Sequence, residues 1–220
     1  MSMKIKALIP VRSGSTRVLN KNTRPFAGST LLDIKIQQLL KVKSLDGIVV
    51  NSNSDEMLEI ASKYQGVELV KRDDTFASNT VYMTDVFENM AQNFPGDIIV
   101  YCAVTYPLLG SETIERVIAK YFEGNHDSIA PASRVKQFLF LDGKPLNFNP
   151  SRFPRSQDLP NIVALNFGAA VIARDLMVKR KSTVGMNPYL YELGETESFD
   201  IDTQFEFDIA EYLYKKSPVL

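Results

Sequence analysis

The stretch IPVRSGSTRVLNKN, from Ile9 to Asn22, does most to decide the fold of this chain. It continues an apolar run, Ile5 to Val11, that predicts the first strand of a sheet. The loop after this strand combines small residues with cations: Arg12, Ser13, Gly14, Ser15, Arg17 and Lys21. Small residues let a backbone approach a phosphate group and point amide hydrogens at it, and cations neutralise its charge. Because nucleotides usually bind at the carboxyl ends of strands in an open sheet, the stretch predicts a phosphate-binding loop.

The spacing of this loop leaves a second interpretation open. It lacks the glycine spacing and the final Gly-Lys-Ser/Thr of a Walker loop, and it lacks the three-glycine fingerprint of dinucleotide-binding folds. On its own pattern the stretch is therefore also compatible with a basic surface loop that binds nothing.

Composition predicts one globular domain that spans residues 1–220. The chain has 220 residues, of which 45% are hydrophobic and 23% charged, so it can bury a sizeable core. The net charge of -1 provides no overall basic surface, and we expect neither nucleic acid nor a membrane as a partner. Anionic ligands must then be bound by local clusters of cations.

The single cysteine and the short apolar runs predict a cytoplasmic protein. Cys102 cannot form a disulfide within the chain, which suits a reducing compartment. No apolar run approaches the length of about 18 residues that a membrane span needs. The first residues pass directly into the predicted strand, so we expect no signal peptide.

The histidine content narrows the chemistry further. His126 is the only histidine, so a histidine-rich metal site, a Cys-His pair and a Ser-His-Asp triad are excluded. The remaining groups are carboxylates, cations, hydroxyls and a bound metal ion.

Strand and helix patterns alternate through the first 132 residues. Helical patterns at 31–42, 54–64, 80–93 and 111–122 alternate with strand patterns at 47–51, 67–70, 97–104 and 128–132. This alternation predicts an α/β fold with a doubly wound, mostly parallel sheet and helices on both faces.

The alternation stops after Ala132. Residues 135–148 predict a hairpin around Asp142-Gly143, and residues 150–160 form a loop punctuated by prolines. We interpret 134–160 as an inserted arm, either an edge elaboration or a dimer contact. Beyond it, the patterns predict an apolar stretch, a short helix, a strand and a final helix at 162–172, 175–179, 189–193 and 203–215.

Two aspartates near the C-terminus are a second chemical signal. Asp200 and Asp202 are two residues apart, so in an extended segment their carboxylates lie on one side and suit magnesium carried by a nucleotide. Thr203 and Glu206 have the spacing of a capping box, so the same acids also suit a helix start. The two interpretations are compatible.

Five stretches in chain order carry a family resemblance: the loop from Arg12 to Asn22, RDDTFASNT (72–80), RSQDLP (155–160), NFGAAVI (166–172) and PYLYELGETESFDIDT (188–203). They resemble motifs of the bacterial CMP-N-acetylneuraminate synthetases (acylneuraminate cytidylyltransferases) and of their relatives acting on legionaminate and pseudaminate. Together the stretches cover nearly the whole chain.

The resemblance implies a fold, a reaction and an assembly. The fold is that of nucleotide-diphospho-sugar transferases. The anomeric hydroxyl of a nonulosonic, sialic-acid-like sugar acid attacks the α-phosphate of CTP, pyrophosphate leaves, and Mg²⁺ (or Mn²⁺) is required. The hairpin arm makes a homodimer and leans over the neighbouring subunit's site.

The resemblance also implies roles for single residues. Those holding the nucleotide are Arg12, Ser13, Gly14, Ser15, Arg17, Lys21 and Asn22, with Arg72 and Ser78 near the cytosine. Those at the sugar acid are Arg155, Gln157 and Asn166, and those holding the metal are Asp200 and Asp202. We also expect Tyr106, which departs from the family pattern, to contact the sugar acid. Within this set, Arg12, Lys21 and Asp202 carry catalysis.

Several positions depart from the family pattern. Ala103 replaces a glutamine that usually meets the sugar acid, and Tyr106 and Leu109 replace a serine and an arginine. We expect these changes to make the rim of the sugar pocket bulkier and less charged, and to disfavour N-acetylneuraminate. Two alternatives stay open: a nucleotidyltransferase for an octulosonate or another sugar, and a nucleotide-binding relative without catalysis.

Overall fold

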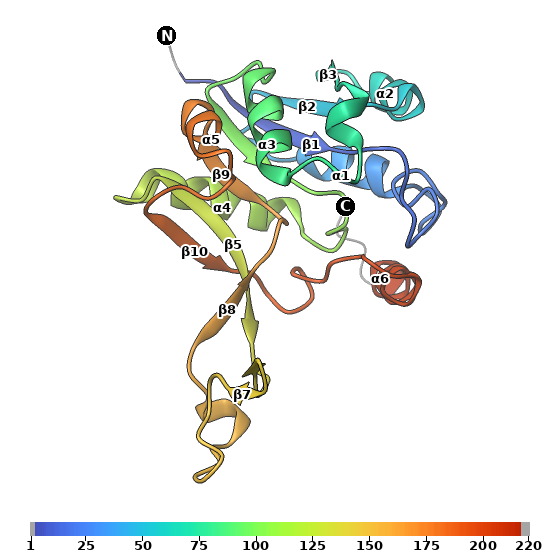
Figure 1. Ribbon diagram of the computed structural model, residues 1–220. Helices are drawn as coiled ribbons and strands as arrows, with labels where there is room; N and C mark the ends of the chain where they lie inside the picture. Colours follow the sequence, from blue (N-terminus) through green and yellow to red (C-terminus); the bar gives the residue numbers. More distant parts are fainter. Residues whose placement is uncertain (1–2, 217–220) are drawn as a thin grey trace.

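One eight-stranded sheet organises residues 3–216, the part of the chain that the computed structural model describes (Figure 1). The strand order is β10-β5-β9-β4-β1-β2-β3, and β8 pairs with β5. The bounds are β1 Ile5–Pro10, β2 Gly47–Ser52, β3 Val67–Lys71, β4 Ile98–Tyr101, β5 Ser128–Val135, β8 Ile162–Leu165, β9 Ala170–Ala173 and β10 Pro188–Glu192. Neighbours are parallel except at β8 and β9, so the predicted mostly parallel sheet is confirmed.

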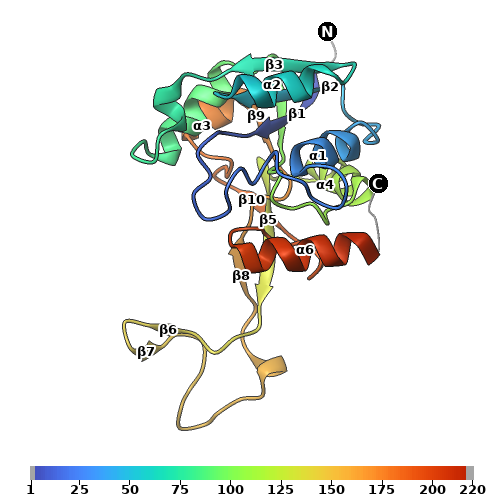
Figure 2. The ribbon, with the colours of Figure 1, turned by 90° about the vertical axis from the view of Figure 1, so that its right-hand side faces the viewer.

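Alternate side chains of the central strands point into two cores, one on each face of the sheet. Ala7 and Ile9 of β1 pack on one face, and Leu8 packs on the other. The first core is completed by α1 Leu31–Leu39, α2 Asp55–Ser62, α4 Ser111–Glu123 and α6 Gln204–Lys216 (Figure 2). The second core is completed by α3 Met83–Gln92 and α5 Arg174–Arg180. Helices therefore cover both faces, as the doubly wound pattern predicted.

Several sequence-based boundaries differ from the structure, and in two places the element itself is different. The apolar stretch 162–172 is not one element, because it divides into β8 and β9, which lie antiparallel to β5. The helix expected from residue 80 begins at Met83, since Tyr82 is still extended, and a short 3₁₀ helix, η1 Asp74–Ala77, precedes it.

The arm extends away from the body of the molecule, below the sheet in Figures 1 and 2. It contains two short paired strands, β6 Phe140–Leu141 and β7 Lys144–Pro145, and a 3₁₀ helix, η2 Ser156–Asp158. Asp142 and Gly143 have φ angles of 50° and 75°, the left-handed pair that a tight hairpin turn requires. The hairpin was predicted around these two residues, but its strands are much shorter than the pattern suggested.

A cluster of phenylalanines gives the arm its own small apolar centre. The rings of Phe138, Phe148 and Phe153 lie 4.8 to 5.1 Å apart between centroids. Phe140 and Phe153 nevertheless remain 62% and 63% exposed. The arm therefore carries large apolar side chains that the described residues do not cover.

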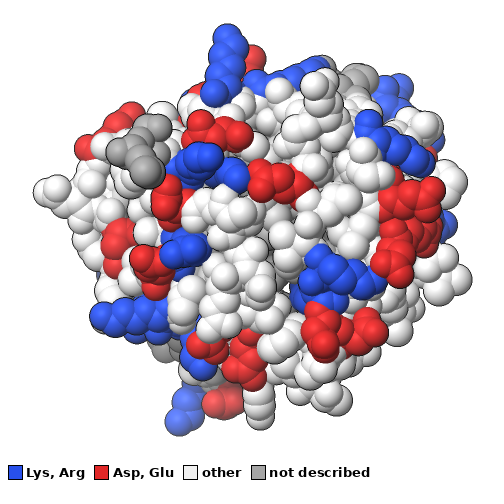
Figure 3. Space-filling view, turned by 90° about the horizontal axis from the view of Figure 1, so that it is seen from above, with Lys and Arg blue, Asp and Glu red and all other residues white. Residues whose placement is uncertain are grey.

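The surface of the body is mixed in charge. On the face seen from above in Figure 3, lysines and arginines are interspersed with aspartates and glutamates. Within residues 3–216, no helix combines the length and the apolar character that a membrane span requires.

Candidate active site

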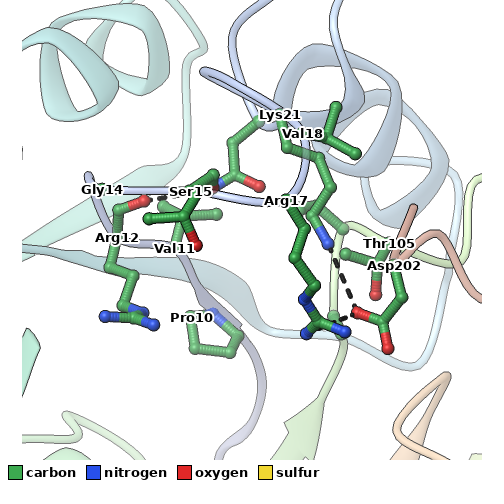
Figure 4. A pocket seen from close by; sticks show the side chains of 14 residues that line it. Pro10, Val11, Arg12, Gly14, Ser15, Arg17, Val18, Lys21, Thr105 and Asp202 are labelled. Carbon is green, nitrogen blue, oxygen red and sulfur yellow. Dashed lines mark hydrogen bonds and ion pairs between the residues drawn. The ribbon is translucent and has the colours of Figure 1, made fainter. Parts of the chain in front are cut away.

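A cavity of about 200 Å³ opens at the carboxyl end of β1 (Figure 4). Its wall comes from three separate parts of the chain: the loop after β1, the segment after β4, and the segment before α6. The lining residues include Arg12, Gly14, Ser15, Arg17, Lys21, Asn22, Ala103, Thr105 and Asp202. The structure thus places the predicted phosphate loop and the predicted metal aspartate around one cavity.

Side chains behind the loop hold it in shape. Asn22 is 6% exposed, and its amide Nδ2 donates to the carbonyl of Arg12 over 3.2 Å, which ties the two ends of the loop together. Asn53, just after β2, accepts from the Ser13 amide at 3.1 Å and donates to the Ser13 hydroxyl at 2.9 Å. Gly14 has a φ angle of 82°, a conformation that a residue with a Cβ rarely adopts.

Two cations of the loop point at Asp202 (Figure 4). Arg17 Nη2 lies 3.1 Å and Lys21 Nζ 3.8 Å from Asp202 Oδ1. Lys21 Nζ also donates to the carbonyl of Ile201 at 2.5 Å. Burial lowers the pKa of Lys21, and the charges of Asp202 and Asp200 oppose that shift. The cavity therefore holds concentrated positive charge that one carboxylate only partly balances.

A second cavity, of about 340 Å³, adjoins the first. The two share Pro10, Val11, Arg12 and Ala103, so Arg12 stands between them. Arg12 Nη1 donates to the carbonyl of Ala77 at 2.6 Å, and Nη2 donates to Asn79 Oδ1 at 2.8 Å. The remaining wall is largely apolar and aromatic, with Phe76, Val81, Val86, Met90 and Tyr101 beside Arg72 and Ser78.

Arg72 is fixed at the floor of the second cavity. It is 5% exposed, and its Nη2 donates to the carbonyl of Val11 at 2.5 Å. An apolar slot with a few fixed polar groups suits a flat heterocycle, whereas the cationic first cavity suits phosphate groups.

The two aspartates sit in different surroundings. Asp202 lines the first cavity and is half-exposed, whereas Asp200 Oδ2 accepts from the Tyr106 hydroxyl at 3.1 Å. Asp200 Oδ1 is buried and has no hydrogen-bond partner within residues 3–216. Burial, the largest effect, raises the pKa of Asp200. The neighbouring Thr105 and Tyr106 hydroxyls oppose that shift, and the negative charge of Asp202 adds to it. A buried carboxylate oxygen without a partner is the kind of group that a cation stabilises.

The donor set fits magnesium only in part. Within residues 3–216 there is no group of three or more His, Cys, Asp or Glu side chains able to hold a metal. Two carboxylates leave most positions of an octahedral ion to phosphate oxygens and waters, which is how Mg²⁺ is usually held beside a nucleotide. The capping box is present as well, because Thr203 N donates to Glu206 Oε2 at 2.7 Å and Glu206 N to Thr203 Oγ1 at 3.3 Å. The helix start therefore orients the segment that carries the aspartates.

Comparison with known proteins places this arrangement in a family. The family model described as cytidylyltransferase matches residues 6–216. The chain belongs to the cytidylyltransferase family. It is therefore a nucleotidyltransferase enzyme.

Two relatives are similar in sequence along nearly the whole chain, and one solved structure shares the fold. Post-translational flagellin modification protein B of Campylobacter coli is 28% identical over 96% of this chain and 95% of its own length. Pseudaminic acid cytidylyltransferase of Campylobacter jejuni serotype O:2 is 27% identical over 97% of each chain. The structure of CMP:2-keto-3-deoxy-manno-octonic acid synthetase complexed with CTP superposes with a TM-score of 0.72, at 14% identity, over 97% of this chain and 99% of that one. At that identity the structural likeness concerns the fold alone.

In this cytidylyltransferase, four residues expected at the sugar acid do not line either cavity. Arg155 pairs with Asp158 at 2.8 Å on the arm, and Gln157 lines a separate cavity at the base of the arm. Asn166 is 5% exposed, and its amide donates to Ser133 Oγ and accepts from the Gly168 amide. Within a single chain, Asn166 therefore supports a turn rather than facing the cavities.

The expected position of Tyr106 was wrong. Tyr106 and Leu109 are 3% and 0% exposed, so neither forms a rim of the pocket. The chain turns inward after Ala103, which places the Tyr106 hydroxyl between Asp200 and the Phe167 amide. Burial, followed by the charge of Asp200, raises the pKa of Tyr106, so its hydroxyl keeps its proton and donates to the carboxylate.

Three further residues of the site were not predicted from the sequence. Asn53 holds the phosphate loop, Asn79 holds Arg12, and Thr105 lines the first cavity. Asn53 and Thr105 both follow strands at the carboxyl edge of the sheet, the place where polar residues of α/β enzymes gather. That position was the signal available for finding them.

Proposed function

We propose that this cytidylyltransferase transfers the CMP group of CTP to a nonulosonic sugar acid, preferably a deoxygenated, diamino acid of the pseudaminate or legionaminate type. The single observation that carries the proposal is the pair of adjoining cavities, one cationic and one apolar, with Arg12 between them. The relative named pseudaminic acid cytidylyltransferase, which aligns along almost the whole chain, supports the choice of substrate.

In this proposal the nucleotide lies across both cavities. The cytosine enters the apolar cavity beside Arg72 and Ser78, and the triphosphate follows the loop toward Arg17 and Lys21. Amide groups of the loop and the guanidinium of Arg12 then contact phosphate oxygens. These groups stabilise negative charge in the transition state, the main requirement of nucleotidyl transfer.

Asp200 and Asp202 would hold Mg²⁺, or Mn²⁺, that arrives with the triphosphate. When bound, the ion would neutralise charge on the phosphates and orient them for in-line attack. The partnerless Oδ1 of Asp200 and the half-exposed Asp202 support this role. Arg17, which pairs with Asp202 in this structure, would turn toward the phosphates once the ion takes its place.

The transfer forms one bond and breaks one. The anomeric hydroxyl oxygen of the sugar acid attacks the α-phosphorus, and the bond from that phosphorus to the bridging oxygen of the β-phosphate breaks. The products are the CMP-sugar acid and pyrophosphate, and the hydroxyl proton is lost to solvent or to a nearby carboxylate. Lys21 and Arg12 hold the departing charge, so Arg12, Lys21 and Asp202 are the residues we assign to catalysis.

The sugar acid would enter from the side of Ala103, which lines both cavities. A methyl group there offers no hydrogen bond, so a sugar hydroxyl that needs a partner is left unpaired, and a deoxygenated sugar is favoured. Arg155 and Gln157 lie on the arm and line neither of the two cavities of their own chain. We propose that a homodimer brings the arm of one subunit to the site of the other, where these residues meet the sugar acid together with the segment around Asn166.

The location we propose is the cytoplasm, where CTP is available, and the product would serve the biosynthesis of a bacterial surface polysaccharide or glycan. The second candidate substrate, an octulosonate, is supported only by the fold of the CTP-bound synthetase structure.

Pyrophosphate release tests the proposal. The protein is mixed with CTP, Mg²⁺ and one of four acids: pseudaminate, legionaminate, N-acetylneuraminate or octulosonate. We expect the highest kcat/KM with one of the first two and at least about tenfold less with N-acetylneuraminate, the loss typical of one unpaired buried polar group. A preference for N-acetylneuraminate or octulosonate would refute the substrate assignment, and release with none of the four would refute the sugar-acid assignment. An Asp202→Asn protein serves as the blank.

A further inference from the structure

Tyr106 holds one oxygen of Asp200 at the buried side of the site. Its hydroxyl donates to Asp200 Oδ2 at 3.1 Å and accepts from the Phe167 amide at 3.3 Å. The side chain lines neither of the two cavities, so it contacts the site only through Asp200.

The backbone of Tyr106 is fixed from the opposite direction. Its carbonyl accepts from Lys35 Nζ at 3.0 Å and from the Leu109 amide at 3.3 Å. Gln38, one turn along α1 from Lys35, donates to the neighbouring carbonyl of Pro107 at 2.7 Å. Lys35 and Gln38 are both fully buried. The tyrosine is therefore anchored at both ends, and its hydroxyl has little freedom to move.

The aspartate segment is fixed beside it. The Ile201 amide donates to the carbonyl of Thr105 at 3.0 Å, and the Ile201 side chain is fully buried. With its backbone held there, Asp200 can change only its side-chain torsions. Tyr106 occupies Oδ2, and the buried Oδ1 stays without a partner within residues 3–216.

We propose that Tyr106 is a positioning residue, which fixes the orientation of the Asp200 carboxylate toward the nucleotide-borne metal ion. The inference rests on the metal role proposed for Asp200 and extends it to a residue that touches neither nucleotide nor metal. Hydrogen bonds to a ligating carboxylate set its orientation in advance, and their loss typically weakens metal binding about 10- to 100-fold.

The test is the magnesium dependence of CTP binding to Tyr106→Phe, measured by calorimetry without any sugar acid. The phenylalanine keeps the ring and removes only the hydroxyl. Without metal, we expect the variant to bind CTP as tightly as the parent does. The Mg²⁺ concentration that gives half of the maximal increase in CTP affinity should rise about tenfold. In turnover assays the same shift should occur in the Mg²⁺ requirement, with kcat at saturating Mg²⁺ close to that of the parent.

Tyr214→Phe is the matched control. Tyr214 is also a buried tyrosine of the same core, but its hydroxyl has no partner within residues 3–216. Its removal should leave the magnesium dependence unchanged. In an Asp200→Asn background, Tyr106→Phe should add no further shift, because the effect passes through Asp200.

The outcomes separate the two proposals. If Mg²⁺ does not change the affinity of the parent for CTP, the metal role proposed for Asp200 is refuted. If Mg²⁺ strengthens CTP binding to the parent and to Tyr106→Phe at the same Mg²⁺ concentration, the positioning role alone is refuted. Equal weakening of CTP binding with and without metal would make Tyr106 a general support of the fold and would also overturn the inference.

Discussion

Lys21 Nζ donates to the carbonyl of Ile201 at 2.5 Å, across 180 positions of the chain. Ile201 lies between the two aspartates, so this bond ties the phosphate loop to the proposed metal segment without any ligand present. The loop therefore does not have to find the aspartates when a nucleotide binds. Preorganisation of this kind lowers the entropy cost of assembling the site.

The protein should select CTP over ATP, GTP and UTP. The second cavity has Arg72 and Ser78 in an otherwise largely apolar wall, which suits a pyrimidine with a particular pattern of donors and acceptors. We expect at least about tenfold tighter binding of CTP than of UTP, since a site built to pair with polar groups rejects an analogue that lacks them. Calorimetry with the four nucleotides and Mg²⁺ measures this, and equal affinities would contradict the cytosine assignment.

Removing either aspartate charge should abolish most turnover. We expect Asp202→Asn and Asp200→Asn each to lower kcat about 100-fold or more, because charge developing on the phosphates then lacks its stabilising partner. Circular dichroism should show an intact fold. Asp208→Asn, an exposed acid in α6, is the control and should keep parental activity. Near-parental turnover of both site variants at saturating Mg²⁺ would reduce the aspartates to supports of the helix start.

The arm should pair two subunits. Phe140 and Phe153 are 62% and 63% exposed in the single chain, and apolar side chains of this size on a thin hairpin need a covering surface. Light scattering at micromolar concentration should give the mass of a dimer. The double variant Phe140→Lys/Phe153→Lys should have a mass closer to that of the monomer and a lower turnover with a sugar acid.

Met186→Lys is the control for the arm variant. Met186 is 70% exposed and lies outside the arm, so its replacement should leave the mass unchanged. A parental protein that scatters as a monomer, yet is fully active, would exclude a site shared between subunits.

Lys35 should make the protein more stable as pH rises above neutrality. Burial lowers the pKa of Lys35 from 10.5 to about 8. Between these values the unfolded chain holds a proton that the folded chain has released, so the free energy of unfolding rises with pH. From pH 7.5 to 9 we expect a gain of about 1 kcal/mol relative to Lys35→Met, which lacks the group.

The comparison of the parent with Lys35→Met separates the titration of Lys35 from that of the neighbouring Cys102. Burial raises the pKa of Cys102 to about 12, which acts in the opposite direction at high pH but is common to both proteins. Urea unfolding at each pH provides the free energies. A difference between parent and variant that does not change with pH would mean that the amine is not titrating in this range.

The local patterns of the sequence were sufficient to predict the sheet and the position of the loop after β1. Continuous apolar runs in β1 and β2 predicted strands with two buried faces, and small residues with cations after β1 predicted the loop. The Asp142-Gly143 turn was predicted for the same reason, since its backbone conformation depends on those two residues alone. The antiparallel β9 was not predicted, because strand direction depends on the path of the chain through the arm rather than on any local pattern.

The position of Tyr106 shows what the sequence by itself could not decide. The chain as written determined which residues are chemically able to hold phosphate, base and metal: Arg12, Lys21, Arg72, Asp200 and Asp202. Only the tertiary structure decided that Tyr106 turns inward to Asp200, and that Lys21 reaches Ile201. The physical reason is that strand and loop patterns arise from neighbours in sequence, whereas these contacts join segments that meet only when the sheet and its helices pack together.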